Sequence, residues 1–226
     1  MTISTVNRSF EKIGRGEFYL AALPAASVFS SCATQADYVK KYFEQFYTTG
    51  TGDTLKALTA GVKPYASLTS DGLKVKVKQN PIDSDPNSGP KHTVGIQDTE
   101  ITFEMGIIDL TPQKLAELAS CSTEELIAQA AATGKAGRSQ VMVGGQSILT
   151  PYVGMYRMPS TLVPGEFDHI LMPRINVVLD TDFDFNKKSV LSCKVKGTCL
   201  QEAYGLVNAA GFPEQMIYDI ANAAAV

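Results

Sequence analysis

Residues 175–201, INVVLDTDFDFNKKSVLSCKVKGTCLQ, contain two runs in which apolar and polar side chains alternate. A repeat of two residues predicts a β-strand with one apolar face and one polar face. The apolar parity of the two runs consists of Val177, Leu179, Phe183 and Phe185, and then Leu191, Cys193, Val195 and Cys199. Residues 186–188 separate the runs and predict a short turn, so the two strands are expected to form an antiparallel hairpin.

The register of this hairpin follows from its apolar faces. Pairing apolar with apolar sets Leu179 opposite Val195 and, on the other face, Asp180 opposite Lys194. One register then gives an apolar face and a charged face with a cross-strand ion pair, and this agreement supports the hairpin. Only one face can belong to the core, so we expect the charged face to lie on the other side. Its side chains are Asp180, Asp182, Asp184, Lys194 and Lys196.

The three aspartates also have the spacing of the first ligands in a calcium-binding loop. Such a loop needs glycine at its sixth position, where this chain has Phe185, and a glutamate at its twelfth, which is missing. The alternation with Phe183 and Phe185 predicts a strand with a solvated carboxylate face. We therefore predict no metal site here.

A second alternating run, LKVKVKQ, occupies residues 73–79. Leucine and valine side chains face one side of this predicted strand, and a stripe of lysines faces the other: Lys74, Lys76 and Lys78. The stripe complements the aspartates in charge, so the two could meet across a subunit boundary. We therefore expect the three lysines to be inter-subunit contacts.

Further strands are predicted at 16–22, 93–110, 139–149, 151–158 and 167–175, and a loop rich in proline at 80–91. Within 93–110 the apolar parity switches between Asp98 and Ile101, which predicts a bulge or bend.

Helices are predicted in three places. Thr34 and Asp37 can cap a first helix, whose aromatic side chains recur at helical spacing, and a short helical turn is expected at 54–60. Capping signals at Thr111 and Ser122 predict a helical hairpin over 112–132, and a last helix is expected at 213–224. The apolar face of the helical hairpin consists of Leu115, Leu118, Leu126 and Ile127. The sequence thus predicts a single mainly β (α+β) domain over 1–226, a sandwich or barrel with an inserted helical hairpin and helical embellishments near 34–60 and 213–224.

The composition argues against several classes of function. The chain has 226 residues and a formal net charge of −3, without the basic excess that a protein gripping nucleic acid needs. No apolar run approaches the length of a membrane span, and the first residues lack the apolar core of a signal peptide. We therefore expect synthesis in a cytoplasm and no membrane insertion.

Residues that could carry out catalysis are sparse. The four cysteines, Cys32, Cys121, Cys193 and Cys199, lack metal-ligand spacing and are predicted to be reduced, mostly buried side chains. The two histidines, His92 and His169, have no neighbouring nucleophile, and no nucleotide-binding loop is present. The sequence predicts no catalytic residue, no metal and no cofactor.

Three segments together resemble the major tail tube proteins of long-tailed bacteriophages. They are IGRGEFYLAAL at 13–23, TEITFEMGIIDLTPQKLAELAS at 99–120 and GEFDHILMPRINVVLDTDFDFN at 165–186, and the F-D-x-I-x-x-P-R within the last segment is the most specific piece. They cover about a quarter of the chain in the order that the family has. Residues 34–60 match no pattern of that family.

The resemblance implies a structural virion protein, and neither an enzyme nor a cofactor. Its subunits would form hexameric rings that stack into the tail tube, together with terminator, distal tail and tape measure proteins. DNA would pass through during ejection without specific binding. Six subunits with four strands each would give a barrel roughly 37 Å across, which is wide enough for a duplex. The resemblance further suggests that the charged face of the final hairpin lines the lumen.

Three other interpretations stay open. A related tube or terminator component, or a tube like that of type VI secretion, would share the same sequence features. A carbohydrate- or receptor-binding β-sandwich would expose aromatic side chains, and the absence of tryptophan counts against it. A hydrolase is disfavoured because no nucleophile and base occur together.

Overall fold

The fold was taken from a computed structural model of the chain. The residues that it describes are 16–49, 55–65, 68–84, 92–107, 114, 126–129, 138–141, 149–179, 193–209 and 211–221. The molecule is mainly β, as the sequence predicts, with one α-helix among the described residues.

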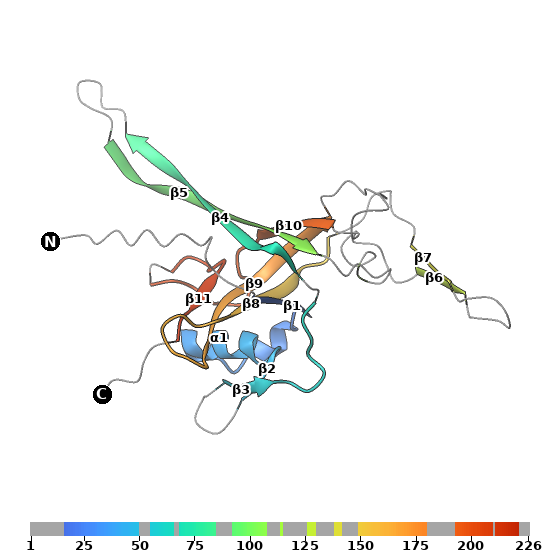
Figure 1. Ribbon diagram of the computed structural model, residues 1–226. Coiled ribbons are helices and arrows are strands. Elements are labelled where there is room, and N and C mark those ends of the chain that lie inside the picture. The colour runs from blue at the N-terminus through green and yellow to red at the C-terminus, as the bar shows by residue number, and fades with distance from the viewer. Residues whose placement is uncertain are drawn as a thin grey trace.

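One curled antiparallel sheet, shaped like half a barrel, organises the molecule (Figure 1). Its strand order is β1 (Glu17–Ala22), β8 (Tyr152–Pro159), β9 (Phe167–Leu179), β10 (Cys193–Cys199), β5 (His92–Ile107) and β4 (Leu68–Ser84). A further short strand, β11 (Ile217–Asp219), pairs with β9. β10 covers the far end of β9, and β11 continues along the same edge where β10 has ended.

The register predicted for the final hairpin is confirmed where it can be compared. Leu179 lies opposite Val195, and Val178 lies opposite Lys196. Along β10 the burial alternates at every residue, so the cysteine and valine side chains face inward and the lysines face outward. The rest of the hairpin, with Asp180, Asp182 and Asp184, lies outside the described residues.

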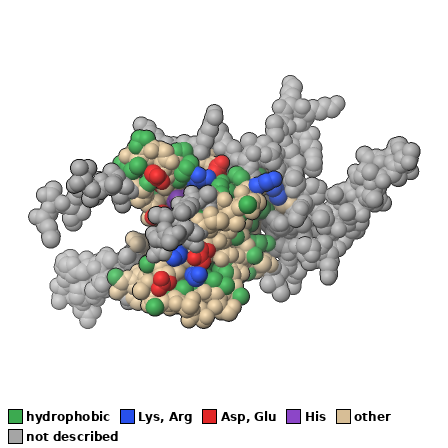
Figure 2. All heavy atoms as spheres, turned by 90° about the horizontal axis from the view of Figure 1, so that it is seen from below, with side chains coloured by type: hydrophobic (Ala, Val, Ile, Leu, Met, Phe, Trp, Pro, Cys, Tyr) green, Lys and Arg blue, Asp and Glu red, His purple; other side chains and the backbone are tan. Residues whose placement is uncertain are grey.

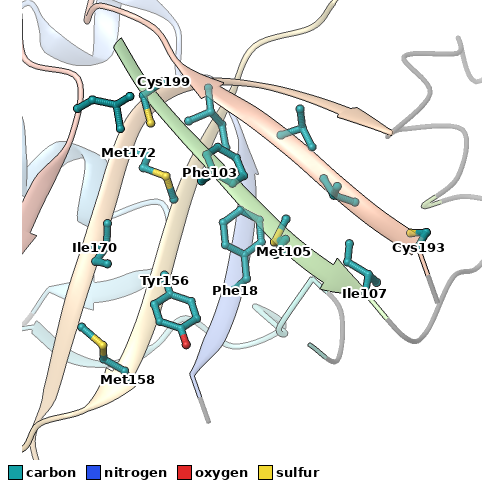
Figure 3. Packing of buried hydrophobic residues seen from close by; sticks show 14 residues of the cluster. Phe18, Phe103, Met105, Ile107, Tyr156, Met158, Ile170, Met172, Cys193 and Cys199 are labelled. Carbon is teal, nitrogen blue, oxygen red and sulfur yellow. The ribbon is translucent and has the colours of Figure 1, made fainter. Parts of the chain in front are cut away.

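The concave side of the sheet holds an inner cluster of apolar side chains (Figure 3). The rings of Phe18 on β1 and Phe103 on β5 pack with 6.0 Å between their centroids, Tyr156 of β8 belongs to the same cluster, and Met172 and Cys199 close one end of the group. Each Å² of apolar surface removed from water stabilises a fold by about 25 cal/mol, so a cluster of many buried side chains dominates the stability of a domain. Gly197 is required here, because a Cβ atom at this position would meet the Phe103 ring at 2.0 Å.

A second, outer cluster covers the opposite face of β1, β8 and β9. It is built largely from the helix α1 (Gln35–Phe43), the 3₁₀ turn η2 (Ala26–Phe29) and the strand side chains of the other parity. Phe18 therefore belongs to the inner cluster and its neighbour Tyr19 to the outer one. The predicted capping box is confirmed: the Thr34 side chain accepts from the backbone N–H of Asp37, and the Asp37 carboxylate accepts from the Thr34 backbone N–H. Tyr42, Phe43 and Phe46 are buried, as predicted.

Three helix predictions were wrong. The segment at 54–60 contains the strand β3 (Leu55–Leu58), which pairs with β2 (Tyr47–Thr49). The C-terminal segment contains β11, where Ile217 and Tyr218 pair with the free edge of β9. In the expected helical hairpin, β6 (Leu126–Gln129) pairs with β7 (Arg138–Val141). In each case the local sequence has a helical pattern, but the segment pairs with another strand. A short stretch of sequence does not show such a partner, so the pairing could not be predicted from it.

The first helix of that expected hairpin falls almost entirely outside the described residues, where Lys114 alone is helical. The predicted inward positions Leu115 and Leu118 lie there as well. Leu126 and Ile127 lie on β6, so they cannot belong to a helical face.

The strands β4 and β5 form a hairpin much longer than the sequence predicts. Pairing continues to Ser84 and His92. Residues 80–84, which are the described part of the loop expected at 80–91, are therefore strand. Figure 1 shows this hairpin extending away from the other strands of the sheet. The pairing register shifts between Asn80 and Pro81, which leaves Gln97 of β5 without a partner residue. The bulge predicted between Asp98 and Ile101 is therefore not found there: pairing is continuous over those residues, and the shift lies just before Asp98.

Candidate functional surface

The convex side of β10, β5 and β4 carries a polar face, directly behind the inner cluster. Lys196 of β10 pairs with Glu104 of β5, and Glu104 pairs with Lys74 of β4. Side chains in such rows are about 5 Å apart, so Glu104 lies between two lysines, while Glu100 faces Lys78 of β4 alone. The residues of the polar face are Lys74, Lys76, Lys78, Glu100, Thr102, Glu104, Lys194, Lys196 and Thr198.

The polar face unites two groups that the sequence assigned to different surfaces. Lys194 and Lys196 were expected in a lumen, and Lys74, Lys76 and Lys78 at a subunit boundary. The strand order β10–β5–β4 and the pairing register put all five lysines on one face of one sheet. Only two glutamates accompany them there, so the described part of this face is basic.

The outer edge of β4 borders the polar face. Among the described residues, no strand pairs with this edge. Natural proteins place lysine and proline on such edges, because both discourage uncontrolled pairing. β4 carries the three lysines and also Pro81. Val77, on the apolar parity of this edge strand, is 51% exposed, although Ile101 opposite to it on β5 belongs to the inner cluster.

A charged row crosses the opposite end of the molecule and was not predicted. Pairing sets Glu17, Arg157, His169 and Asp219 side by side on β1, β8, β9 and β11. The Arg157 Nη1 atom is 3.6 Å from Glu17 Oε2, and His169 Nδ1 is 3.4 Å from Asp219 Oδ2. The Tyr47 hydroxyl is 2.8 Å from His169 Nε2. His169 of β9 is thus a buried histidine with contacts to Tyr47 of β2 and Asp219 of β11.

The hydroxyl groups beside this row are poor nucleophiles. Burial raises the pKa of Tyr47 to about 12, and burial together with the nearby Glu17 carboxylate raises the pKa of Tyr19 to about 12. Both phenols therefore stay protonated at neutral pH. The arrangement can tie strands together electrostatically, but it offers no activated oxygen.

A buried carboxylate forms the other unpredicted polar centre. Glu202 accepts the Tyr42 hydroxyl at 2.6 Å and the backbone N–H groups of Tyr204, Gly205 and Leu206 at 2.8 to 2.9 Å. The three backbone donors fix the turn at residues 202–206, and the Tyr42 hydroxyl ties this turn to α1. No sequence signal identifies Glu202, because its partners are backbone groups and a tyrosine 160 residues away.

The described thiols are not activated, because burial raises the pKa of Cys32, Cys193 and Cys199 above the ordinary value. Cys193 and Cys199 are buried, Cys32 is half-buried, and these three are free; Cys121 lies outside the described residues. Burial raises the pKa of the Cys199 thiol to about 12. Within the described ranges, no three His, Cys, Asp or Glu side chains come together as metal ligands would.

The face that carries α1 shows no further charged patch among the side chains described there. In Figure 2, acidic and basic side chains are interspersed with apolar ones on this side. In the described part of the chain, no helix is both long enough and apolar enough to span a bilayer. The polar face is therefore the candidate functional surface. In comparisons with known proteins, the chain matches no family model and no curated protein.

Proposed function

We propose that this protein is the structural subunit of a bacteriophage tail tube. The observation that carries the proposal is the curled sheet, which has an apolar concave side and a polar convex side on β10, β5 and β4. Adjacent strands with one solvated face are what each subunit would contribute to a 24-stranded tube. The three sequence segments that resemble tail tube proteins support the same function.

In this proposal the polar face lines the lumen. Five lysines without acidic side chains to balance them would retain DNA. Each lysine that neutralises a phosphate releases counterions from the DNA, and this release strengthens binding. Asp180, Asp182 and Asp184 continue the same face if the observed register extends beyond Leu179. They would balance the lysines, so that the lumen carries charges of both signs and DNA slides past.

The partners follow from this role. Copies of the chain would form hexameric rings, and the rings would stack and meet terminator, distal tail and tape measure proteins. The subunit is made in the host cytoplasm and ends in the virion tail. It acts without catalysis and without a cofactor, and DNA passes through it without specific recognition.

Negative-stain microscopy of the purified protein at rising concentration tests the proposal. We expect rings that stack into hollow tubes. Single closed rings that never stack would favour a terminator component instead. Light scattering that shows only monomers at high concentration across a range of salt would refute self-assembly altogether.

A further inference from the structure

An aromatic side chain stands exposed on a braced turn, the Phe212 turn, whose described residues are 207–209 and 211–213. Phe212 is 67% exposed. Its backbone N–H donates to the Asn208 side chain at 3.1 Å, and its carbonyl accepts from the Asn208 N–H at 2.9 Å. Val207 and Pro213 form an isolated bridge at the base of the turn, and Gly211 supplies the positive φ of 83° that the turn needs. The ring is therefore held out on a rigid support.

The exposure of Phe212 alone would need no explanation, because single apolar side chains are common on surfaces. Its surroundings are acidic. A depression of about 410 Å³ beside the ring is lined by Glu214 and Asp98, among others. The Phe212 turn is thus an aromatic projection with carboxylates next to it.

A second depression, the Tyr65 depression, has the opposite character. It has a volume of about 800 Å³ and lies between β1 and the segment that follows β3. Leu20, Phe46 and Tyr65 contribute apolar surface to it, and Lys63 and Lys114 add positive charge. An aromatic ring flanked by carboxylates is complementary to this depression in both polarity and charge.

The two features lie far apart on one molecule. In Figure 1 the orange-red chain leading to β11 is on the left, and the teal segment after β3 is on the right. A projection cannot reach the depression of its own molecule across the sheet. Two different patches on opposite sides produce a head-to-tail contact, which closes into a ring when the rotation allows it.

We propose that the Phe212 turn of one copy inserts into the Tyr65 depression of the next copy. The inference rests on the proposed ring assembly and names the side chains that make one of its contacts. Phe212 is the buried anchor of this contact, and Glu214 faces Lys63 across it. Aromatic anchors of this kind dominate the binding energy of an interface, whereas charge pairs at the rim select the partner.

Charge reversal tests the contact through mixing. Glu214→Lys alone and Lys63→Glu alone each set like charges against each other, so neither variant should assemble at the wild-type concentration. In an equimolar mixture, the two variants can alternate around a ring with an even number of subunits, so that every contact again joins opposite charges. The double variant, Glu214→Lys with Lys63→Glu, restores opposite charges at every contact with a single protein. Light scattering and negative-stain microscopy measure the outcome for the five samples.

A truncation tests the anchor. Phe212→Ala should raise the concentration needed for assembly by roughly tenfold or more, as for other central aromatic residues. Leu162→Ala is the matched control, because Leu162 is also exposed, at 52%, and lies on a different turn; it should change that concentration less than about twofold. Thermal unfolding of both variants should match the wild type, since neither side chain belongs to the core.

The outcomes separate the two proposals. A wild-type protein that never assembles refutes the tube subunit, and the contact with it. A wild-type protein that assembles, while Phe212→Ala and both single charge reversals assemble equally well, refutes only the contact. Failure of the mixture to recover assembly also refutes the contact.

Discussion

The close approach of Gly197 to Phe103 gives a prediction at the scale of a single residue. Gly197→Ala forces a methyl group into the Phe103 ring, so the free energy of unfolding should fall by about 1–3 kcal/mol. Thr198→Ala, at the neighbouring exposed position, should change it by less than about 0.5 kcal/mol. Urea denaturation of both variants measures the difference. Equal stability of the two would show that β10 does not approach β5 in this way.

Glu202 should be among the most sensitive single positions. Glu202→Ala leaves three backbone N–H groups and the Tyr42 hydroxyl without their acceptor, so it should cost roughly 3 kcal/mol or more. Tyr42→Phe removes one donor and should cost about 1–2 kcal/mol. The double variant should lose less than the sum, because both changes break one network. Strict additivity would contradict the shared network.

The thiols should differ in reactivity according to burial. At pH 9 an ordinary cysteine is substantially ionised, but the pKa of Cys199 is about 12, so its thiolate is scarce below that pH. We expect iodoacetamide to alkylate Cys199 more slowly than the half-buried Cys32, as measured by mass spectrometry. After denaturation all four cysteines should titrate with Ellman's reagent. Equal native rates, or two or fewer thiols, would contradict this picture.

At the scale of elements, the negative charge that the proposed lumen receives from the aspartates can be reversed. Reversing Asp180, Asp182 and Asp184 to lysine should leave tubes intact but make them retain DNA in a salt-dependent way, if the face is luminal. The same positions changed to asparagine should give weaker retention. Loss of ring assembly, restored by reversing Lys74, Lys76 and Lys78, would instead identify the face as a subunit interface.

Sequence patterning succeeded for elements whose partner is close in the chain or whose cap is local. The β9–β10 register followed from alternation, and α1 followed from Thr34 and Asp37. Patterning failed for β6 and β11, because each has an ordinary helical composition and becomes a strand only through its neighbour. The charged row could not be predicted either, since Glu17, Arg157 and Asp219 meet only after four strands have been ordered.

For the whole molecule, we predict a single cooperative unfolding transition. The inner and outer clusters share β1, β8 and β9, where adjacent residues such as Leu171 and Met172 face opposite clusters. Because the two clusters share these strands, neither cluster can unfold without removing the strands on which the other packs. Circular dichroism and tyrosine fluorescence should therefore report the same midpoint. Two separate transitions would divide the chain into independent units.

The position of β1 sets the order in which the chain can fold during synthesis. Glu17 pairs with Arg157, so the first strand has no partner until the ribosome has made the residues of β8. At 5–20 residues per second this delay is roughly 7 to 28 seconds. Throughout that time, α1 and its aromatic side chains have no sheet to cover. The nascent chain therefore exposes the apolar side chains of β1 and α1, among them Phe18, Tyr19, Tyr42 and Phe43, until β8 is made, and these are the side chains that a chaperone would meet first.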